Sequence, residues 1–367
     1  MKARTVVPIN SADARRSVQR FGKSPRTSAV PVLPLDAYGT PEWAAARRAM
    51  IGASEMAAVL GRSPFASPFS LWWSKQEGWE LEQTLSMRLG HELEPIIAKL
   101  FSEARPDLLV CQPNASLWRS PIVEWLACTP DCLAVAYDTV PDVPVEYAHD
   151  KGYGHGPCHI EPVELKSDEG GHGWGKPGTD EVPDHHRVQA LQQCAVFGAP
   201  RGHLVRMAGK RFSAYVIEYD SNAQTEMAGW VAEGHAFAAS LDAGVAPELD
   251  GHHATADTLS RLYPGQSEEF EAVVPDDVAT DYEMAGAALD AAKAAYVAAQ
   301  NAVRGHLKEQ RFGVVASTGR RFVDRRVYKR RGYEVGPAEV DALYPVGRNR
   351  RPKHAAAPTL DLPGVGG

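Results

Sequence analysis

Two stretches of sequence decide the fold of this chain, Thr129-Pro130-Asp131 and Val163-Glu164-Leu165-Lys166. The second is typical of a short strand that enters the core of an α/β protein. Because successive side chains of a strand point to opposite faces, Glu164 and Lys166 share one face and Leu165 faces the core. Asp131 directly precedes another strand-like stretch, Cys132–Ala136, which would bring its carboxylate beside Glu164.

These residue types suit the binding of Mg²⁺, which prefers hard oxygen ligands such as carboxylates. The backbone carbonyl of Leu165 could add a further ligand. Lys166 would lie beside the metal, where an ammonium group can polarise an attacking water or a scissile phosphate. The same pattern also fits an exposed strand with a salt bridge, because Pro-Asp followed by Glu-x-Lys often occurs by chance. The two motifs alone leave both interpretations open.

Composition limits the class of protein. The chain has 367 residues, of which 44% are hydrophobic and 23% charged. Single cores stop growing at roughly 250–300 residues, so one core plus an added module is expected. No stretch reaches the roughly 18 apolar residues of a membrane helix. The five cysteines contain no Cys-x-x-Cys pair, which disfavours a disulfide framework or a structural zinc site and favours a reducing compartment. A net charge of −7 still allows nucleic-acid binding, because phosphate requires only a local basic face.

The order of the segments predicts four regions. Residues 1–34 are expected to form a disordered basic tail, residues 35–250 a core, residues 265–335 a helix-plus-hairpin module, and residues 336–367 a flexible tail. Residues 137–160 are expected to form a long loop, and 244–266 a linker.

Within the core, apolar periodicity and capping residues predict helices mixed with strands, an α/β (α+β) order that indicates a central mixed sheet flanked by helices. Ser54 is expected to cap the second of the helices. The expected helices are Pro41–Met50, Glu55–Leu60, one from Pro68, Met87–Ser102 broken or begun at Pro95, Asp184–Phe197 and Met227–Ala243. The expected strands are Leu108–Cys111, Leu117–Trp118, Glu124–Cys128, Cys132–Ala136, Pro162–Lys166, His203–Ala208 and Phe212–Tyr219.

The C-terminal module contains an alanine-rich helix over residues 281–307. Large apolar side chains repeat every seven residues along it, with alanines beside them, which predicts a seam that packs on another helix. The seam residues are Tyr282, Leu289, Tyr296 and Val303. Val314–Ala316 and Arg321–Val327 are expected to form a basic hairpin.

Several further motifs lie along residues 40–220, before and after the two opening stretches. They are Trp43-x3-Arg47-Arg48-x2-Ile51-Gly52-Ala53-Ser54-Glu55, Gly61-x2-Ser63-Pro64-Phe65, Leu71-Trp72, Met87-x2-Gly90-x3-Glu94-Pro95 and Val182-Pro183-Asp184-x4-Gln189. Together with Thr129-Pro130-Asp131 and the Glu-x-Lys strand, they resemble the lambda-exonuclease/YqaJ family of phage recombination nucleases. The resemblance implies a restriction-endonuclease-like nuclease core of the PD-(D/E)xK type.

The resemblance also implies roles for particular residues. Asp131, Glu164 and Glu94 would bind two Mg²⁺ ions, for which Mn²⁺ can substitute, and Lys166 would position or activate the water. His91 is a further candidate ligand. The 5′-terminal phosphate of DNA would be held by four residues, Arg47, Ser54, Thr129 and Gln189. Two departures from the family pattern stand out: Thr129 replaces a serine, and Leu191 occupies the place of a second glutamine.

The activity implied is that of a 5′-to-3′ exodeoxyribonuclease on linear double-stranded DNA ends, leaving 3′ single strands for homologous recombination. A single-strand annealing recombinase is the expected partner, a ring trimer is one expected homo-oligomer, and the host cytoplasm is the expected location, away from membranes. An endonuclease, a RecB-like end-processing nuclease and a catalytically silent DNA-binding module remain as alternatives. The register between Asp131 and Glu164 stays open, because the 137–160 insertion separates them.

Overall fold

The computed structural model describes residues 27–34, 37, 39–79, 84–111, 116–137, 158–167, 172–264, 272–330 and 338–345. The chain divides into two compact units, Met1–Gln266 and Ser267–Gly367. The expected loop 137–160, the N-terminal tail and the C-terminal tail fall largely outside the described residues.

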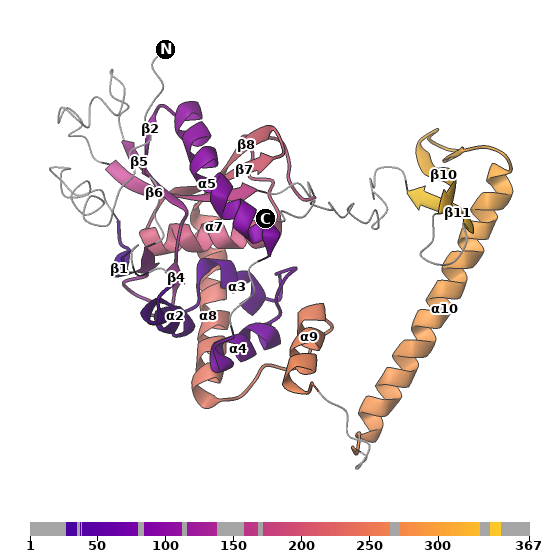
Figure 1. Ribbon diagram of the computed structural model, residues 1–367, viewed down its shortest axis with the longest axis horizontal. Coiled ribbons are helices and arrows are strands. Elements are labelled where there is room, and N and C mark those ends of the chain that lie inside the picture. The colour runs from indigo at the N-terminus through magenta and orange to yellow at the C-terminus, as the bar shows by residue number, and fades with distance from the viewer. Residues whose placement is uncertain are drawn as a thin grey trace, which may run out of the picture. The chain divides into compact units, whose positions relative to one another are not determined.

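The first unit is built on a five-stranded mixed sheet (Figure 1). Its strand order is β2 (Leu108–Cys111), β5 (Cys132–Tyr137), β6 (Cys158–Ser167), β7 (Arg201–Ala208) and β8 (Arg211–Glu218). Strands β6 and β7 run parallel, and the other neighbours are antiparallel. The predicted α/β class with a central mixed sheet is therefore confirmed.

Helices cover the two faces of this sheet (Figure 1). On one face, Ile97 and Phe101 of α5 (Leu85–Ala104) pack with Val163 and Leu165 of β6. On the other face, α7 (Asp184–Phe197) packs against β6 and β7 through a separate core cluster that includes Leu191. Alternation along β6 thus sends Leu165 into the α5 core and Glu164 toward α7, as predicted.

Within its described residues, the first unit contains eight further helices and strands. They are β1 (Val30–Leu33), α2 (Pro41–Arg48), α3 (Ala53–Val59), α4 (Pro68–Glu77), β3 (Leu117–Arg119), β4 (Ala127–Cys128), α8 (Ser221–Ala243) and α9 (His253–Leu262). Strands β1, β3 and β4 form a second, three-stranded sheet.

Three expectations for this unit are wrong. Val30–Leu33 of the expected tail forms β1, because its apolar residues pair with β3. Helix α5 runs unbroken through Pro95; the proline is exposed, and Ile97, Ala98 and Phe101 remain buried on the core side. The expected linker 244–266 contains a helix, α9, which buries Thr255 and Thr258 on one side.

A buried carboxylate stabilises the start of β6. Glu161 accepts hydrogen bonds from His159 Nε2 at 2.9 Å and from His203 Nε2 at 2.6 Å. Burial would raise the pKa of Glu161, but the two imidazoles outweigh burial and lower it to about 2. A carboxyl whose pKa is depressed by folding stabilises the fold above its unfolded pKa, and this contribution is lost as pH falls through the folded pKa.

Glu161→Gln is therefore expected to lower the free energy of unfolding by about 2–3 kcal/mol at pH 7. The difference from the parent should shrink as pH falls from about 4.5 toward 2. Urea unfolding at pH 7, 5 and 3 measures it, with the exposed Glu92→Gln as the control. A difference independent of pH would contradict the account.

The second unit contains a long helix, α10 (Asp276–Leu307), and a three-stranded antiparallel sheet. The sheet has the order β11 (Ala338–Pro345), β10 (Arg321–Arg330), β9 (Phe312–Val314). The predicted helix and hairpin are present. Strand β11 corrects the expected flexible tail 336–367: apolar residues alternate at Ala338, Val340, Ala342 and Tyr344, which is the period of a strand.

Candidate active site

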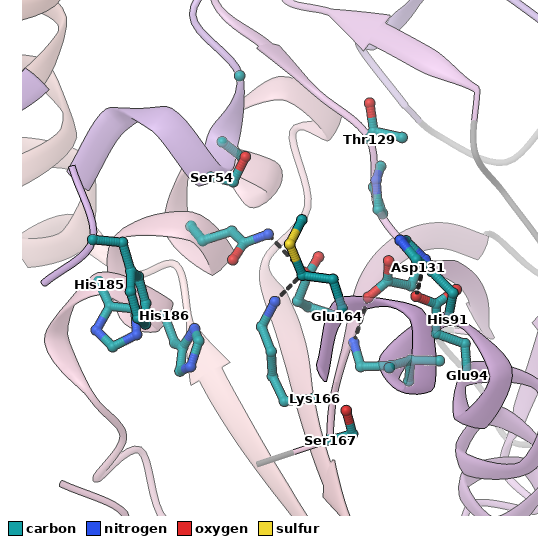
Figure 2. Close-up of a pocket in the computed structure, with 18 of the residues that line it drawn as sticks. Ser54, His91, Glu94, Thr129, Asp131, Glu164, Lys166, Ser167, His185 and His186 are labelled. Carbon is teal, nitrogen blue, oxygen red and sulfur yellow. Dashed lines mark hydrogen bonds and ion pairs between the residues drawn. The ribbon is translucent and has the colours of Figure 1, made fainter. Parts of the chain in front are cut away.

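One cavity of about 890 Å³ brings together every residue predicted for the metal site and the phosphate site. Its walls come from the ends of α2 and α3, the first half of α5, the start of β5, the end of β6 and the start of α7 (Figure 2). The predicted residues that line it are Arg47, Ser54, His91, Glu94, Thr129, Asp131, Glu164, Leu165, Lys166 and Gln189.

The register of β5 and β6 places Asp131 beside Glu164. Cys132 pairs with Val163, so the residue before Cys132 lies opposite the residue after Val163. Asp131 Oδ2 accepts a hydrogen bond from the backbone N–H of Leu165 at 2.7 Å. This bond orients the carboxylate across the strand that carries Glu164 and Lys166, despite the long insertion between the two motifs.

Glu164 is the most enclosed carboxylate of the cavity, with 4% of its surface exposed. Oε1 accepts hydrogen bonds from the Lys166 ammonium and from Gln189 Nε2 at 2.6 Å, and Oε2 accepts one from Gln193 Nε2 at 2.7 Å. Gln189 and Gln193 lie one helical turn apart on α7, so both reach the same carboxylate.

Sequence reasoning missed Gln193. It looked for a second glutamine two residues after Gln189, and that position, Leu191, is fully buried in the core instead. The i, i+4 spacing of Gln189 and Gln193 was the signal in the sequence that could have found it.

The three acidic residues of the cavity repel one another in a poorly solvated space. Burial raises the pKa of Asp131 well above its usual range, and the carboxylates of Glu164 and Glu94 raise it further. Burial also raises the pKa of Glu94, and Glu164 adds to the rise against the opposing effect of His91, whose Nδ1 lies 3.0 Å from Glu94 Oε1. The site therefore holds more negative charge than its own side chains neutralise.

Lys166 is the positive charge within this group. Burial alone would lower the pKa of its ammonium, but the carboxylates of Glu164 and Asp131 outweigh burial and raise it. Lys166 is therefore protonated at neutral pH and acts as a hydrogen-bond donor.

The donor set fits a hard divalent cation. No three His, Cys, Asp or Glu side chains within the described residues stand close enough together to form a ready metal site. Each carboxylate is instead turned toward a hydrogen-bond donor, as Asp131 is toward Leu165 and Glu94 toward His91. Carboxylate oxygens with elevated pKa values are the donors whose repulsion a divalent cation would relieve.

A second group of polar residues lies at the other side of the cavity. Ser54 is exposed in the first turn of α3, whose N-cap is Gly52. The expected capping role of Ser54 is therefore wrong. The helix begins at Ala53, two residues before the expected start at Glu55, so the Ser54 hydroxyl is not the cap. Thr129 also lines the cavity, and Figure 2 shows it on the same side of the view as Asp131.

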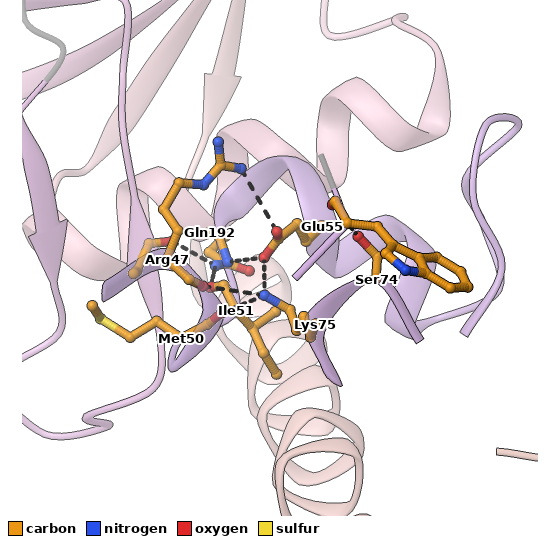
Figure 3. A network of polar contacts seen from close by, with 10 residues as sticks. Arg47, Met50, Ile51, Glu55, Ser74, Lys75 and Gln192 are labelled. Atoms are coloured by element: carbon orange, nitrogen blue, oxygen red, sulfur yellow. Dashed lines mark hydrogen bonds and ion pairs between the residues drawn. The ribbon is translucent and has the colours of Figure 1, made fainter. Parts of the chain in front are cut away.

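Arg47 is held by a network that the sequence did not reveal (Figure 3). The buried Lys75 Nζ donates to the carbonyls of Arg47 at 3.2 Å and Met50 at 2.7 Å, and to Glu55 Oε2 at 2.8 Å. Glu55 Oε1 lies 3.6 Å from the Arg47 guanidinium. Burial would raise the pKa of Glu55, but Lys75 and Arg47 lower it, so the carboxylate stays ionised beside both cations.

Gln192, fully buried on α7, joins the two walls of the cavity (Figure 3). Its Nε2 donates to the carbonyl of Ile51 at 2.9 Å and to that of Ala127 at 2.8 Å. Ile51 lies just before the turn that carries Ser54, and Ala127 lies just before the stretch that carries Thr129 and Asp131. One side chain thus ties both segments to the helix that contacts Glu164.

Two histidines of the α7 N-terminus also line the cavity, His185 and His186. Burial lowers the pKa of His186 to about 2, with Lys166 and His185 adding to the effect, so its imidazole is neutral. The ring of Trp174 lies 5.4 Å from that of His186 and 5.0 Å from that of Tyr215, which makes this half-buried tryptophan part of the packing behind the histidines.

None of the helices within the described residues combines the length and the apolar run that a bilayer span requires.

Comparison with known proteins identifies the segment that builds the cavity. Residues 42–200 match the family described as YqaJ-like viral recombinase domain. Among solved structures, the chain is similar to an alkaline exonuclease, LHK-Exo, from Laribacter hongkongensis, at 21% identity and a TM-score of 0.39, over 61% of this chain and 100% of that one. LHK-Exo in complex with dAMP gives the same identity and TM-score over 61% of this chain and 98% of that one. No curated protein sequence matches.

The matched segment begins within α2 and ends after α7, so it contains every predicted residue of the cavity. Residues 42–200, the segment that builds the cavity, are therefore similar to the YqaJ-like viral recombinase domain.

Proposed function

We propose that this chain is a Mg²⁺-dependent 5′-to-3′ exodeoxyribonuclease that degrades linear double-stranded DNA from its ends and leaves 3′ single-stranded overhangs. One observation carries the proposal: Asp131, Glu164 and Lys166 share a single cavity with the guanidinium of Arg47 and the hydroxyl of Ser54. The donors on that side of the cavity could hold a terminal phosphate while a neighbouring phosphodiester lies at the carboxylates.

Asp131, Glu164, Glu94 and the carbonyl of Leu165 are the residues that would hold the metal, as one or two Mg²⁺ or Mn²⁺ ions. When bound, such ions supply Lewis-acid stabilisation of the charge that develops on the phosphate oxygens. The hydrogen bonds of Gln189 and Gln193 to Glu164 hold this carboxylate in one orientation in this structure.

Lys166 is assigned to the attacking water and the scissile phosphate. Because the carboxylates of Glu164 and Asp131 raise its pKa, the ammonium is protonated in this structure and donates hydrogen bonds. It orients the water from the Glu164 side of the cavity and stabilises negative charge on the phosphate. The imidazole of His186, on the same wall, is neutral and adds no charge beside Lys166.

Arg47, Ser54, Thr129 and Gln189 are assigned to the 5′-terminal phosphate. A guanidinium, two hydroxyls and an amide are the donors that a phosphate monoester requires. Ser54 is exposed in the first turn of α3, where its hydroxyl lines the cavity. Anchoring the 5′ end in this place determines which bond reaches the carboxylates, and so determines the direction of digestion.

Digestion of labelled duplex DNA in the presence of Mg²⁺ tests the proposal. A linear duplex with 5′-phosphate ends should be degraded from the 5′ strand, a 5′-hydroxyl duplex more slowly, and closed circular DNA not at all. Cleavage of the circle would indicate an endonuclease. No digestion, with DNA still bound, would indicate a catalytically silent module.

We further propose that the enzyme acts in the cytoplasm of a bacterial host, and that a single-strand annealing recombinase takes up the 3′ strand. Co-purification with a recombinase expressed beside it, in the presence of DNA, tests this partner. A ring trimer around the duplex is the oligomer expected by resemblance, and sedimentation with linear DNA tests it.

Arg47→Ala is expected to reduce the preference for 5′-phosphate over 5′-hydroxyl ends by roughly 10- to 100-fold, the effect of losing a hydrogen bond to a charged group. The measurement is the ratio of the two digestion rates. Arg48→Ala is the matched control, because Arg48 is the next residue of the same helix and does not line the cavity. Equal ratios in the two variants would rule Arg47 out as the phosphate ligand.

A further inference from the structure

Helix α10 exposes a long row of apolar side chains. Tyr282 is 82% exposed, Leu289 56% and Tyr296 61%. The helix packs on β9 near its C-terminal end, where Leu307 is buried. In most protein helices the stability comes from packing an amphipathic face rather than from the helix alone. A helix of this length therefore has an apolar face that requires a partner.

The face has the heptad spacing of a coiled coil, and its residues alternate in size. We call it the α10 seam. Its members are Val278, Tyr282, Ala285, Leu289, Ala292, Tyr296, Ala299 and Val303. Large residues occupy one heptad position and alanines occupy the other over the middle of the helix.

We propose that the α10 seam binds the α10 seam of a second copy of this chain in an antiparallel pair. When two copies are aligned about the midpoint between Asp290 and Ala291, Tyr282 meets the partner's Ala299, and Leu289 meets the partner's Ala292. Tyr296 meets the partner's Ala285 in the same way, and Val303 meets the partner's Val278. Each large side chain of the central layers thus faces an alanine, which gives layers of even width.

A parallel pair would pack less evenly. Tyrosine would face tyrosine in some layers and alanine would face alanine in the next, so the helix axes could not keep one separation along the seam. The alternation in size therefore favours the antiparallel direction.

The distribution of charge favours the same direction. The first half of α10 carries acidic residues only, and the second half carries basic residues only. The acids are Asp276, Asp277, Asp281, Glu283 and Asp290, and the bases are Lys293 and Arg304. An antiparallel pair places each acidic half beside the partner's basic half, whereas a parallel pair places acidic beside acidic. This complementarity points to a second copy as the occupant of the seam.

The first test is the mass of the full-length protein by sedimentation or light scattering. Ala292→Asp places a carboxylate in the seam and is expected to halve the mass of the assembly. Ala294→Asp makes the same change two residues away on the opposite side of the helix and should leave the mass unchanged. Circular dichroism establishes that both variants keep their helix content. Equal masses in the parent and in both variants would overturn the proposal.

The second test establishes direction by disulfide formation. A mixture of Ala285→Cys and Tyr296→Cys chains should form a mixed disulfide on mild oxidation, because the two positions face each other in the antiparallel pair. Ala285→Cys alone should not form one, since its two copies would lie roughly 16 Å apart at 1.5 Å per residue. The parent, treated alike, gives the background from the native cysteines. A disulfide from Ala285→Cys alone would indicate a parallel pair and contradict the proposal.

Discussion

Lys166→Ala is expected to slow the digestion of linear duplex DNA by on the order of 10²–10⁴-fold, the range for loss of a group that assists proton transfer or stabilises a developing charge. The Lys166 ammonium interacts electrostatically with both Glu164 and Asp131, whose carboxylates raise its pKa. Alanine leaves no donor in its place. Single-turnover digestion of a 5′-phosphate duplex under saturating enzyme measures the chemical step apart from binding.

Lys176→Ala is the control, because Lys176 is exposed on the segment before α7 and does not line the cavity. Glu164 keeps its two glutamine donors in the Lys166 variant, so the fold around β6 should survive. Digestion at the parent rate by Lys166→Ala would remove the residue from the mechanism, whatever the fate of the other assignments.

Asp131→Asn is expected to abolish digestion and at the same time to stabilise the metal-free protein. Loss of a metal ligand should cost more than the roughly 10–100-fold that follows loss of an outer partner. The amide oxygen of asparagine can still accept the hydrogen bond from Leu165, so the local geometry is kept. The variant removes a buried charge that lies beside Glu164 and Glu94.

The sign of the pH dependence follows from the raised pKa of Asp131. A carboxyl whose pKa is raised by folding stabilises the fold below its unfolded pKa, and this contribution is lost as pH rises through the folded pKa. In chelator, the Tm of Asp131→Asn should therefore exceed that of the parent by more at pH 8 than at pH 5.

Addition of Mg²⁺ should raise the Tm of the parent and leave that of Asp131→Asn nearly unchanged, because a ligand stabilises only the protein that binds it. Thermal unfolding followed by circular dichroism supplies both comparisons. A variant that gains no stability in chelator, or that responds to Mg²⁺ as the parent does, would contradict the view of Asp131 as an uncompensated metal ligand.

Local patterns predicted most of the elements that position the site. Strand periodicity was sufficient to place Glu164 and Lys166 on one face of β6 and Leu165 in the core. Gly198, in the αL conformation, ends α7 as predicted, whereas Asp184, expected to cap the helix, is its first residue and Pro183 is the N-cap. These features depend on neighbours a few residues away, which a single sequence contains.

Other features depend on contacts between distant segments, which a single sequence does not reveal. The bond from Leu165 to Asp131 requires the register of β5 against β6, which the long insertion hid. Nothing in the sequence distinguishes Lys75 from other helical lysines. In the folded chain its ammonium donates three hydrogen bonds, to the carbonyls of Arg47 and Met50 and to Glu55. Pro95 suggested a break in α5, and only the buried side of the helix shows why it continues.

Gln192 has a consequence for the size of each cut. A nuclease that grips the end of a strand and cleaves at a distance from the grip measures its product, and the measuring device must be stiff. Through Gln192, Gln189 and Gln193, the single helix α7 contacts the segments that carry Ser54 and Thr129 and also the reactive Glu164. Under the proposed function, α7 would therefore fix the distance between the anchored 5′ end and the bond that is cleaved.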